Sequence, residues 1–349
     1  MDNKKILITG GAGFVGSNLA DSLLRDGCQV LILDSLGRHG TQENLHWLQS
    51  RHPKGLDFVH GDIQDRVLLR QLVKGVKEVY HLAAQVAVTS SVTDPVHDFN
   101  INALGTLNIL EAVRSSGEFI PLLFTSTNKV YGALEGARVT ETASRYALED
   151  LPQGINETQA LDFLSPYGCS KGAADQYVRD YARIYGLPTV VFRMSCIYGP
   201  RQFGNEDQGW VAHFVISAVL GQPITIYGDG KQVRDLLYVE DLVRAFRLAT
   251  ENINITKGQV YNIGGGHANS LAVWREFEPL LRGLLGRPIQ VSYGNWRPGD
   301  QKVYISDISR AARDFNWQPS VSKERGIEKL FHWADENQKM LAEWRSRFA

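Results

Sequence analysis

The pentapeptide Tyr167-Gly168-Cys169-Ser170-Lys171 combines a phenol and an ammonium at a spacing that suits proton transfer. It opens a stretch whose apolar residues recur with helical periodicity, and residues four apart share one face of a helix. A nearby cation favours the phenolate, so we expect Lys171 to lower the pKa of Tyr167 and make it a usable base near neutral pH. The spacing alone is a weak signal, because an ordinary surface helix carries such a pair equally well.

A second pentapeptide, Tyr227-Gly228-Asp229-Gly230-Lys231, has the same spacing and serves as an internal control. Two glycines inside it predict a turn, in which the two side chains do not share a helical face. We therefore keep only the pair at 167 and 171 as a candidate. The elements around that pair decide whether it is catalytic.

The first 34 residues predict a strand, a glycine turn, a helix and a second strand. Residues 6–8 are apolar, Thr9 ends the run, and three glycines follow, Gly10, Gly13 and Gly16. Such glycines permit a tight turn, close approach of the backbone to a pyrophosphate, and phosphate binding at the helix N-terminus. Asp34 ends the second strand, where a carboxylate accepts from a ribose 2′-hydroxyl and repels a 2′-phosphate. NAD is thus favoured over NADP, although Arg38 keeps NADP open as a minority alternative.

Strands and helices continue to alternate through the first 196 residues, with further strands at 30–33, 56–59, 79–82, 122–124 and 189–193. This pattern predicts an α/β fold, a Rossmann-type doubly wound parallel sheet that binds ligands at the carboxyl ends of its strands. We expect residues 1–196, with a returning segment near 235–264 that adds an edge strand, to form the dinucleotide domain. Residues 197–234 and 265–349 would form a smaller mixed α/β substrate domain.

A hydroxyl-rich segment, residues 125–132, directly follows the fifth strand. Together with the glycine turn, Asp62-Ile63, residues 81–84 and the Tyr167/Lys171 pair, it resembles the extended short-chain dehydrogenase/reductase family, which includes NAD-dependent epimerases and dehydratases. The resemblance covers nearly the whole chain. It implies that Tyr167 is the general base on a sugar hydroxyl and that Lys171 binds the nicotinamide ribose. Thr127 would hydrogen-bond the reacting oxygen as the third catalytic group.

The resemblance also implies an NAD site. The pyrophosphate would lie on the turn and the start of the first helix, at Gly10, Gly13, Phe14, Val15 and Gly16. Asp34 would bind the adenosine ribose, and Asp62 and Ile63 the adenine. Three residues after the fourth strand would complete the cleft, Leu82, Ala83 and Ala84.

The two residues after Thr127 separate the reactions of this family. Members that dehydrate nucleotide sugars have an Asp-Glu pair there, and decarboxylating relatives keep the glutamate. This chain has Asn128-Lys129, which offers no carboxylate. Epimerases and simple oxidoreductases remain, and we give neither residue a catalytic role, although Asn128 is expected to contact the substrate.

Several segments favour one subgroup, residues 44–48, 126–132, 163–177 and 207–211. They are similar to family members that epimerise CDP-activated dideoxyhexoses at C2 through a 2-keto intermediate. The alternatives are a C4 epimerase of UDP-hexoses and an NAD(P)H-dependent nucleotide-sugar reductase. A redox-sensing binding protein is disfavoured, since a sensor has no need to keep Thr127, Tyr167 and Lys171 together.

A nucleotide diphosphate needs cations, and arginine pairs with phosphate in bidentate fashion. The candidates beyond residue 197 are Arg201, Arg234 and Arg297. The resemblance implies that Arg234 and Arg297 grip the pyrophosphate and that Asp300 binds a ribose hydroxyl, with Gln208 as a further substrate contact. Phe203 and Trp210 are expected to pack in the core rather than stack on the base.

The formal net charge of −1 over 349 residues gives no reason to expect nucleic acid or a membrane surface as a partner. No apolar run reaches the ~18 residues that a membrane helix needs, and the N-terminus leaves no room for a secretory signal. The three cysteines have no metal-ligand spacing, which predicts no metal and a cytoplasmic enzyme. Apolar residues beyond one stripe on helices 97–115 and 167–186 would form the four-helix interface of this family, in a homodimer or homotetramer.

Overall fold

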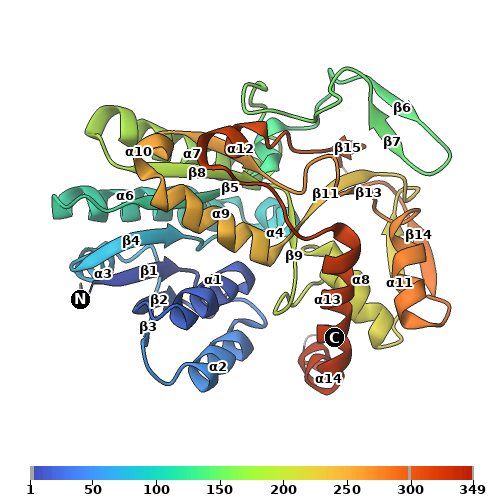
Figure 1. Ribbon diagram of the computed structural model, residues 1–349, viewed down its shortest axis with the longest axis horizontal. Helices are drawn as coiled ribbons and strands as arrows, with labels where there is room; N and C mark the ends of the chain where they lie inside the picture. The colour runs from blue at the N-terminus through green and yellow to red at the C-terminus, as the bar shows by residue number, and fades with distance from the viewer. Residues whose placement is uncertain (1–3, 298–299, 348–349) are drawn as a thin grey trace.

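A computed structural model of the chain describes residues 4–297 and 300–347 (Figure 1). Its main sheet is parallel and has seven strands in the order β12-β8-β5-β4-β1-β2-β3. The strands are β1 (Lys5–Thr9), β2 (Val30–Asp34), β3 (Leu56–His60), β4 (Val76–His81), β5 (Leu122–Thr127), β8 (Thr189–Met194) and β12 (Val260–Ile263). The predicted doubly wound sheet is confirmed, including its edge strand. Strand order reverses between β1 and β4, which is where such sheets bind ligands.

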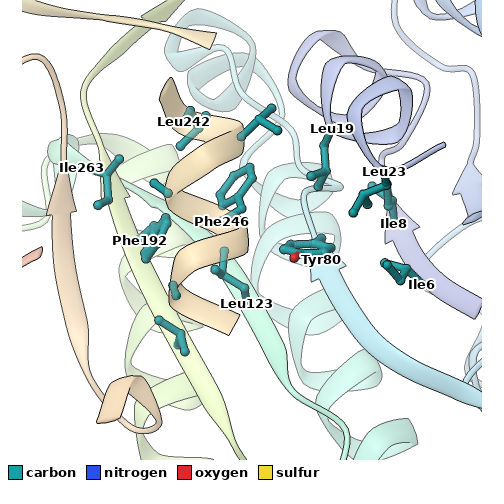
Figure 2. Packing of buried hydrophobic residues seen from close by; sticks show 14 of the residues in the cluster. Ile6, Ile8, Leu19, Leu23, Tyr80, Leu123, Phe192, Leu242, Phe246 and Ile263 are labelled. Carbon is teal, nitrogen blue, oxygen red and sulfur yellow. The ribbon is translucent and has the colours of Figure 1, made fainter. Parts of the chain in front are cut away.

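Helices cover both faces of this sheet. One face carries α1 (Phe14–Arg25), α2 (Thr41–Arg51), α9 (Val239–Glu251) and α12 (Ser309–Phe315); the other carries α3 (Arg66–Leu72), α6 (Gly105–Ser116) and α7 (Ser165–Tyr185). Figure 2 shows Phe246 of α9 lying between Phe192 and Tyr80, whose ring centroids are 5.6 and 5.7 Å away. This packing fixes the sheet beneath the helices that carry the candidate site.

The predicted helix at 97–115 is built from several pieces. A short helix, α4 (Val88–Thr93), precedes α5 (Pro95–Phe99), a π-helical segment (Asn100–Leu104) and then α6. The long helix predicted from residue 167 is continuous as α7, with a proline in its first turn and Gly186 in the left-handed conformation at its end.

The second body of the fold contains two small sheets and a helical layer. One sheet joins β9 (Cys196–Tyr198), β11 (Val233–Tyr238), β13 (Ser270–Ala272) and β15 (Val303–Tyr304); the other pairs β10 (Ile224–Tyr227) with β14 (Val291–Gly294). Its helices are α8 (Trp210–Val219), α11 (Phe277–Leu285), α13 (Lys323–Glu336) and α14 (Gln338–Ser346). The remaining elements are the hairpin of β6 (Val139–Glu141) and β7 (Tyr146–Leu148), the 3-10 turn Asn128–Tyr131, and α10 (Ile253–Thr256).

The domain boundaries predicted from sequence stay a prediction, and the packing adds one detail to them. Phe315 and Trp317 belong to the apolar cluster of the main sheet, together with Phe246 of α9. The chain therefore returns to the dinucleotide domain twice, once near 235–264 as predicted and again at α12. The sequence around Phe315 and Trp317 is a short apolar segment, and such a segment does not indicate which of two hydrophobic cores it joins.

The control pentapeptide behaves as predicted. Gly228 and Gly230 have φ angles of +83° and +76° and form a turn after β10. Lys231 pairs with Glu141 at 2.7 Å, so its ammonium is engaged by a carboxylate. Among the described residues, none of the helices has the length and apolar character that a membrane crossing requires.

Candidate active site

A cavity of about 800 Å³ opens at the carboxyl ends of the main-sheet strands, where the two bodies of the fold meet. Most of the predicted site residues line it: Gly10, Gly13, Phe14, Val15, Gly16, Asp34, Asp62, Ile63, Leu82, Ala83, Ala84, Thr127, Asn128, Tyr167, Lys171 and Gln208. The fold thus gathers segments that are more than 190 residues apart in sequence into one site. The roles of these residues stay predictions, but their common location fits all of them.

Tyr167 and Thr127 both line this cavity and lie near enough to each other for the threonine hydroxyl to act on the pKa of the phenol. Thr127 is the last residue of β5, and Tyr167 lies in the first turn of α7. Burial raises the pKa of Tyr167 to about 12; the Thr127 hydroxyl lowers it, Asp98 raises it and Arg38 lowers it. The phenol is therefore held protonated, on the wall of a cavity that it shares with Thr127.

Lys171 lies one turn further along α7 and is almost fully buried. Its ammonium donates to the backbone oxygen of Thr125 at 2.6 Å and lies 4.2 Å from the centroid of the Phe124 ring. Burial lowers the pKa of Lys171 to about 7, although Asp175 and Asp98 oppose this. The expected lowering of the Tyr167 pKa by Lys171 is not observed: the ammonium points toward β5, and Arg38 is the cation that acts on the phenol.

The glycine turn has the geometry that a pyrophosphate needs. Gly10 has a φ angle of +69°, and a Cβ there would lie 2.7 Å from the backbone nitrogen of Ala83. A Cβ on Gly16 would lie 2.4 Å from the carbonyl oxygen of Gly10. Gly13 caps α1 without any side-chain hydrogen bond, so the first turn of the helix faces the cavity with its N–H groups uncovered.

Asp34 and Ser126 complete the fit to a dinucleotide. The Asp34 carboxylate accepts from the N–H of Ala12 at 3.0 Å and of Leu36 at 2.8 Å, and it keeps further lone pairs for a ribose hydroxyl. Burial raises the pKa of Asp34, whereas these two hydrogen bonds lower it. The buried Ser126 hydroxyl lines the cavity and has no partner within the described part of the chain. The site therefore offers NAD a phosphate cradle, a ribose acceptor and a free donor.

Arg38 has a different place from the one suggested by sequence. Its guanidinium donates to the side-chain oxygen of Gln208 at 3.1 Å, across the mouth of the cavity. It is also near enough to Tyr167 and Asp34 for each to raise its pKa, against the effect of burial. Arg38, which kept NADP open as an alternative, thus connects the loop after β2 to the loop before α8.

Lys129 is a site residue that sequence reasoning missed, because we read it as part of a polar loop. It lines the cavity; burial lowers its pKa, Arg234 lowers it further, and Asp300 and Cys196 oppose this. Arg234 is buried and donates to Asp300 at 2.6 Å. The sequence did offer a signal for Lys129, because this residue comes two positions after Thr127, at the carboxyl end of β5.

The four residues predicted to bind phosphate or ribose do not share one location: Arg201, Arg234, Arg297 and Asp300. Arg234 and Asp300 lie near enough to Lys129 to act on its pKa, although neither is among the residues that line the cavity. Arg297 lies in the smaller body, with its guanidinium 4.0 Å from the centroid of Tyr227; the two residues that follow it, 298 and 299, are outside the described residues.

Arg201 was predicted to bind substrate; this stays a prediction, and Arg201 is not among the residues that line the cavity. Its guanidinium lies 4.3 Å from the centroid of the Trp47 ring, and its backbone oxygen accepts from Asn44 of α2. A planar guanidinium stacks well on an aromatic face, and this stacking holds the side chain on the α2 side, outside the residues that line the cavity.

The two aromatic residues differ as well. Phe203 packs in the core against Trp344 at 5.1 Å, as predicted. Trp210 packs against Phe277 at 5.4 Å, and it also lines the cavity and donates to the sulfur of Cys196. No group of His, Cys, Asp and Glu side chains suited to a metal ion occurs among residues 4–297 and 300–347.

A Rossmann-type sheet with a glycine turn, a terminal aspartate and a Thr-Tyr-Lys set at one cavity defines a short-chain dehydrogenase/reductase of the extended type. Within that class the chain belongs to the GDP-mannose 4,6 dehydratase family, whose model matches residues 7–330. The family predicted from the motifs is confirmed.

Individual relatives resemble the chain along its whole length. It is 45% identical to the CDP-paratose 2-epimerase of Salmonella typhi over 336 residues, which are 94% of this chain and 98% of that protein. The solved UDP-glucuronic acid 4-epimerase of Bacillus cereus, in complex with UDP-glucuronic acid and NAD, has a TM-score of 0.82 at 28% identity and covers 95% and 99% of the two chains. A dTDP-glucose 4,6-dehydratase of Streptomyces venezuelae with NAD bound has a TM-score of 0.83 at 30% identity, covering 97% and 99%.

Proposed function

We propose that the protein is an NAD-dependent epimerase that converts CDP-paratose to CDP-tyvelose at C2. The observation that carries the proposal is the common location of Thr127, Tyr167 and Lys171 in the cavity that also contains the glycine turn and Asp34. The choice of substrate is supported by 45% identity to a CDP-paratose 2-epimerase across nearly the full length of both chains.

The residues suit a reversible oxidation of a sugar carbinol. Bound NAD would accept a hydride from C2 and return it to the opposite face of the resulting 2-keto sugar. Tyr167 would take the proton of the 2-hydroxyl and give it back after the sugar has turned. Thr127 would donate to the same oxygen and hold it beside the phenol, while Lys171 would donate to the ribose of the cofactor.

Tyr167 needs a cation to act as a base near neutral pH, because burial raises its pKa to about 12. Arg38 already lowers it from within the cavity. The positive charge that an oxidised nicotinamide brings acts in the same direction. Oxidised NAD bound in this cavity would therefore favour the basic form of Tyr167.

The pair Asn128-Lys129 supports epimerisation over dehydration. Both side chains line the cavity next to Thr127, where loss of water would need a carboxylic acid and a carboxylate. Neither an amide nor an ammonium removes a carbon-bound proton as a carboxylate does. The chain belongs to a family named for a dehydratase, but we do not expect it to dehydrate a nucleotide sugar.

Substrate binding would rest on the nucleotide and its phosphates. Arg234, Arg297 and Lys129 would supply cations for the pyrophosphate, and Asp300 would accept from a ribose hydroxyl. Asn128 and Gln208 would contact the sugar. Few direct contacts to the hexose suit the proposal, since a sugar that must present both faces needs room to rotate.

The experiment is proton NMR of the purified protein with CDP-paratose in deuterated buffer and no added cofactor. We expect the tyvelose isomer to form with hydrogen retained at C2, because the hydride returns without exchanging with solvent. Conversion with deuterium at C2 would replace hydride transfer by proton abstraction and overturn the mechanism. Absence of conversion would overturn the substrate, and UDP-hexoses would be tested next, since a UDP-glucuronic acid 4-epimerase shares the fold.

We also propose that the enzyme is a cytoplasmic homodimer or homotetramer that serves bacterial surface-polysaccharide synthesis. Apolar side chains exposed on α5 and α7 support the oligomer: Val96, Phe99, Tyr177 and Ile184. Three free cysteines suit a reducing compartment. Light scattering after gel filtration measures the oligomer directly, and a monomer would contradict the proposed interface.

A further inference from the structure

A second cavity, of about 530 Å³, lies at the amino-terminal ends of β8 and β12, on the sheet edge opposite the candidate active site. Figure 1 shows α7, α10 and α12 grouped around this end of β8. The lining residues come from α7, the segment before β12, and α12: Arg179, Arg183, Lys257, Gln259 and Arg310 among them. None of the predicted site residues belongs to it.

The charge of this second cavity is strongly positive and largely uncompensated. Arg193 forms a bidentate pair with Asp175, with distances of 2.8 and 2.9 Å. Arg310 lies 3.7 Å from a carboxylate oxygen of Asp314. In contrast, Arg179, Arg183 and Lys257 form no ion pair with any residue in the described ranges. One carboxylate, Glu157, lines the cavity, and it accepts the backbone N–H of Asn262 at 2.8 Å.

Arg179 shows how closely the cations approach one another. Its Nε is buried and lacks a hydrogen-bond partner within the described part of the chain, while one terminal nitrogen donates to Gln176 at 3.1 Å. Burial lowers the pKa of Arg179, and Arg183 lowers it further; Asp175 opposes this, and Arg193 and Arg310 lower the pKa again. A buried guanidinium N–H without an acceptor is costly, and an anion in the cavity removes both that cost and the repulsion.

We propose that this second cavity binds a compact phosphate-bearing anion, held by Arg179, Arg183 and Lys257. Guanidinium groups bind phosphate oxygens in bidentate fashion, and the volume is within the range of small-molecule sites. The lining contains no aromatic side chain on which a nucleobase would stack. A pyrophosphate or sugar phosphate is therefore a better match than a whole nucleotide. The site is independent of the proposed epimerase activity.

The test is isothermal titration of sodium pyrophosphate into the full-length protein at 0.15 M salt, with NAD and CDP present in excess to occupy the active site. Wild type is expected to bind one pyrophosphate per chain outside the active site. The double variant Arg183→Gln/Lys257→Gln should weaken this binding by about tenfold or more, since it removes two phosphate contacts. Both side chains are exposed, so the variant is expected to fold.

The matched control is Arg70→Gln/Lys339→Gln, which removes the same two charges from other exposed positions and should bind like wild type. Equal affinity in both double variants would overturn the site, as would no binding to wild type. Citrate binding more tightly than pyrophosphate would overturn the phosphate class. If CDP fails to occupy the active site, wild type shows an additional pyrophosphate site, and the Arg183→Gln/Lys257→Gln variant still loses only the one proposed here.

Discussion

Lys171 should make the stability of the nucleotide-free protein depend on pH in a way that one variant removes. Its side chain is 3% exposed, and burial lowers its pKa from an ordinary value of 10.5 to about 7. Between these two values the unfolded chain binds the proton more tightly than the folded protein does. The free energy of unfolding therefore rises as the pH rises through that window.

The two pKa values set the magnitude. From pH 7 to pH 8.5 the linkage integrates to ~1.5 kcal/mol of added stability from Lys171 alone. Lys129, whose pKa burial also lowers from 10.5, is present in wild type and in a Lys171 variant alike, so the difference between the two isolates Lys171. Burial lowers the pKa of His81 to about 3, so most of its contribution arises below pH 7. Burial raises the pKa of Tyr167 and of Cys196, so they act above their ordinary values of 10.0 and 9.0.

The measurement is urea denaturation of nucleotide-free protein at pH 7 and pH 8.5 and constant ionic strength. Wild type should gain ~1.5 kcal/mol more than Lys171→Met over this interval. Lys54→Met, at an exposed position, is the control and should behave like wild type. A gain in Lys171→Met equal to that of wild type would refute the reasoning from burial.

Three further predictions concern the active site. Tyr167→Phe should lower kcat by at least ~10² while bound NAD, followed by absorbance, is retained; an active variant would remove Tyr167 from the mechanism. Gly16→Ala places a Cβ 2.4 Å from the Gly10 oxygen and should weaken NAD binding by about tenfold or more in a fluorescence titration, whereas Gly283→Ala, with open space around it, should not. Lys129→Met should raise KM for the nucleotide sugar by about tenfold with a smaller change in kcat; an unchanged KM would mean that its ammonium does not reach the phosphates.

The prediction of the main sheet and of the glycine turn succeeded because the information is local. Most strands contain a short apolar run, and Gly16 is required by backbone contacts within the turn itself. Gly10 is required by its left-handed φ angle and by the segment after β4. Tyr167 and Thr127 lie at the boundaries of regular elements, so the alternation of strands and helices was enough to bring them to one edge of the sheet.

The positions and charges of the long cationic side chains depended on the tertiary structure. Arg38 donates to Gln208 across the cavity, and Arg201 stacks on Trp47. Lys129 lies near enough to Arg234 for the two charges to interact. Each choice depends on which surfaces the fold places within reach of a flexible side chain.

The sequence by itself determined the fold and the dinucleotide turn, because these follow from periodicity and spacing, and the resemblance to the family supplied Tyr167 and Lys171 as the predicted catalytic pair. Only the tertiary structure decided that Tyr167 is held protonated and that Lys171 turns its ammonium to β5. The physical reason is that a pKa depends on burial and on charges brought together from distant segments, and neither is encoded in the spacing of two residues.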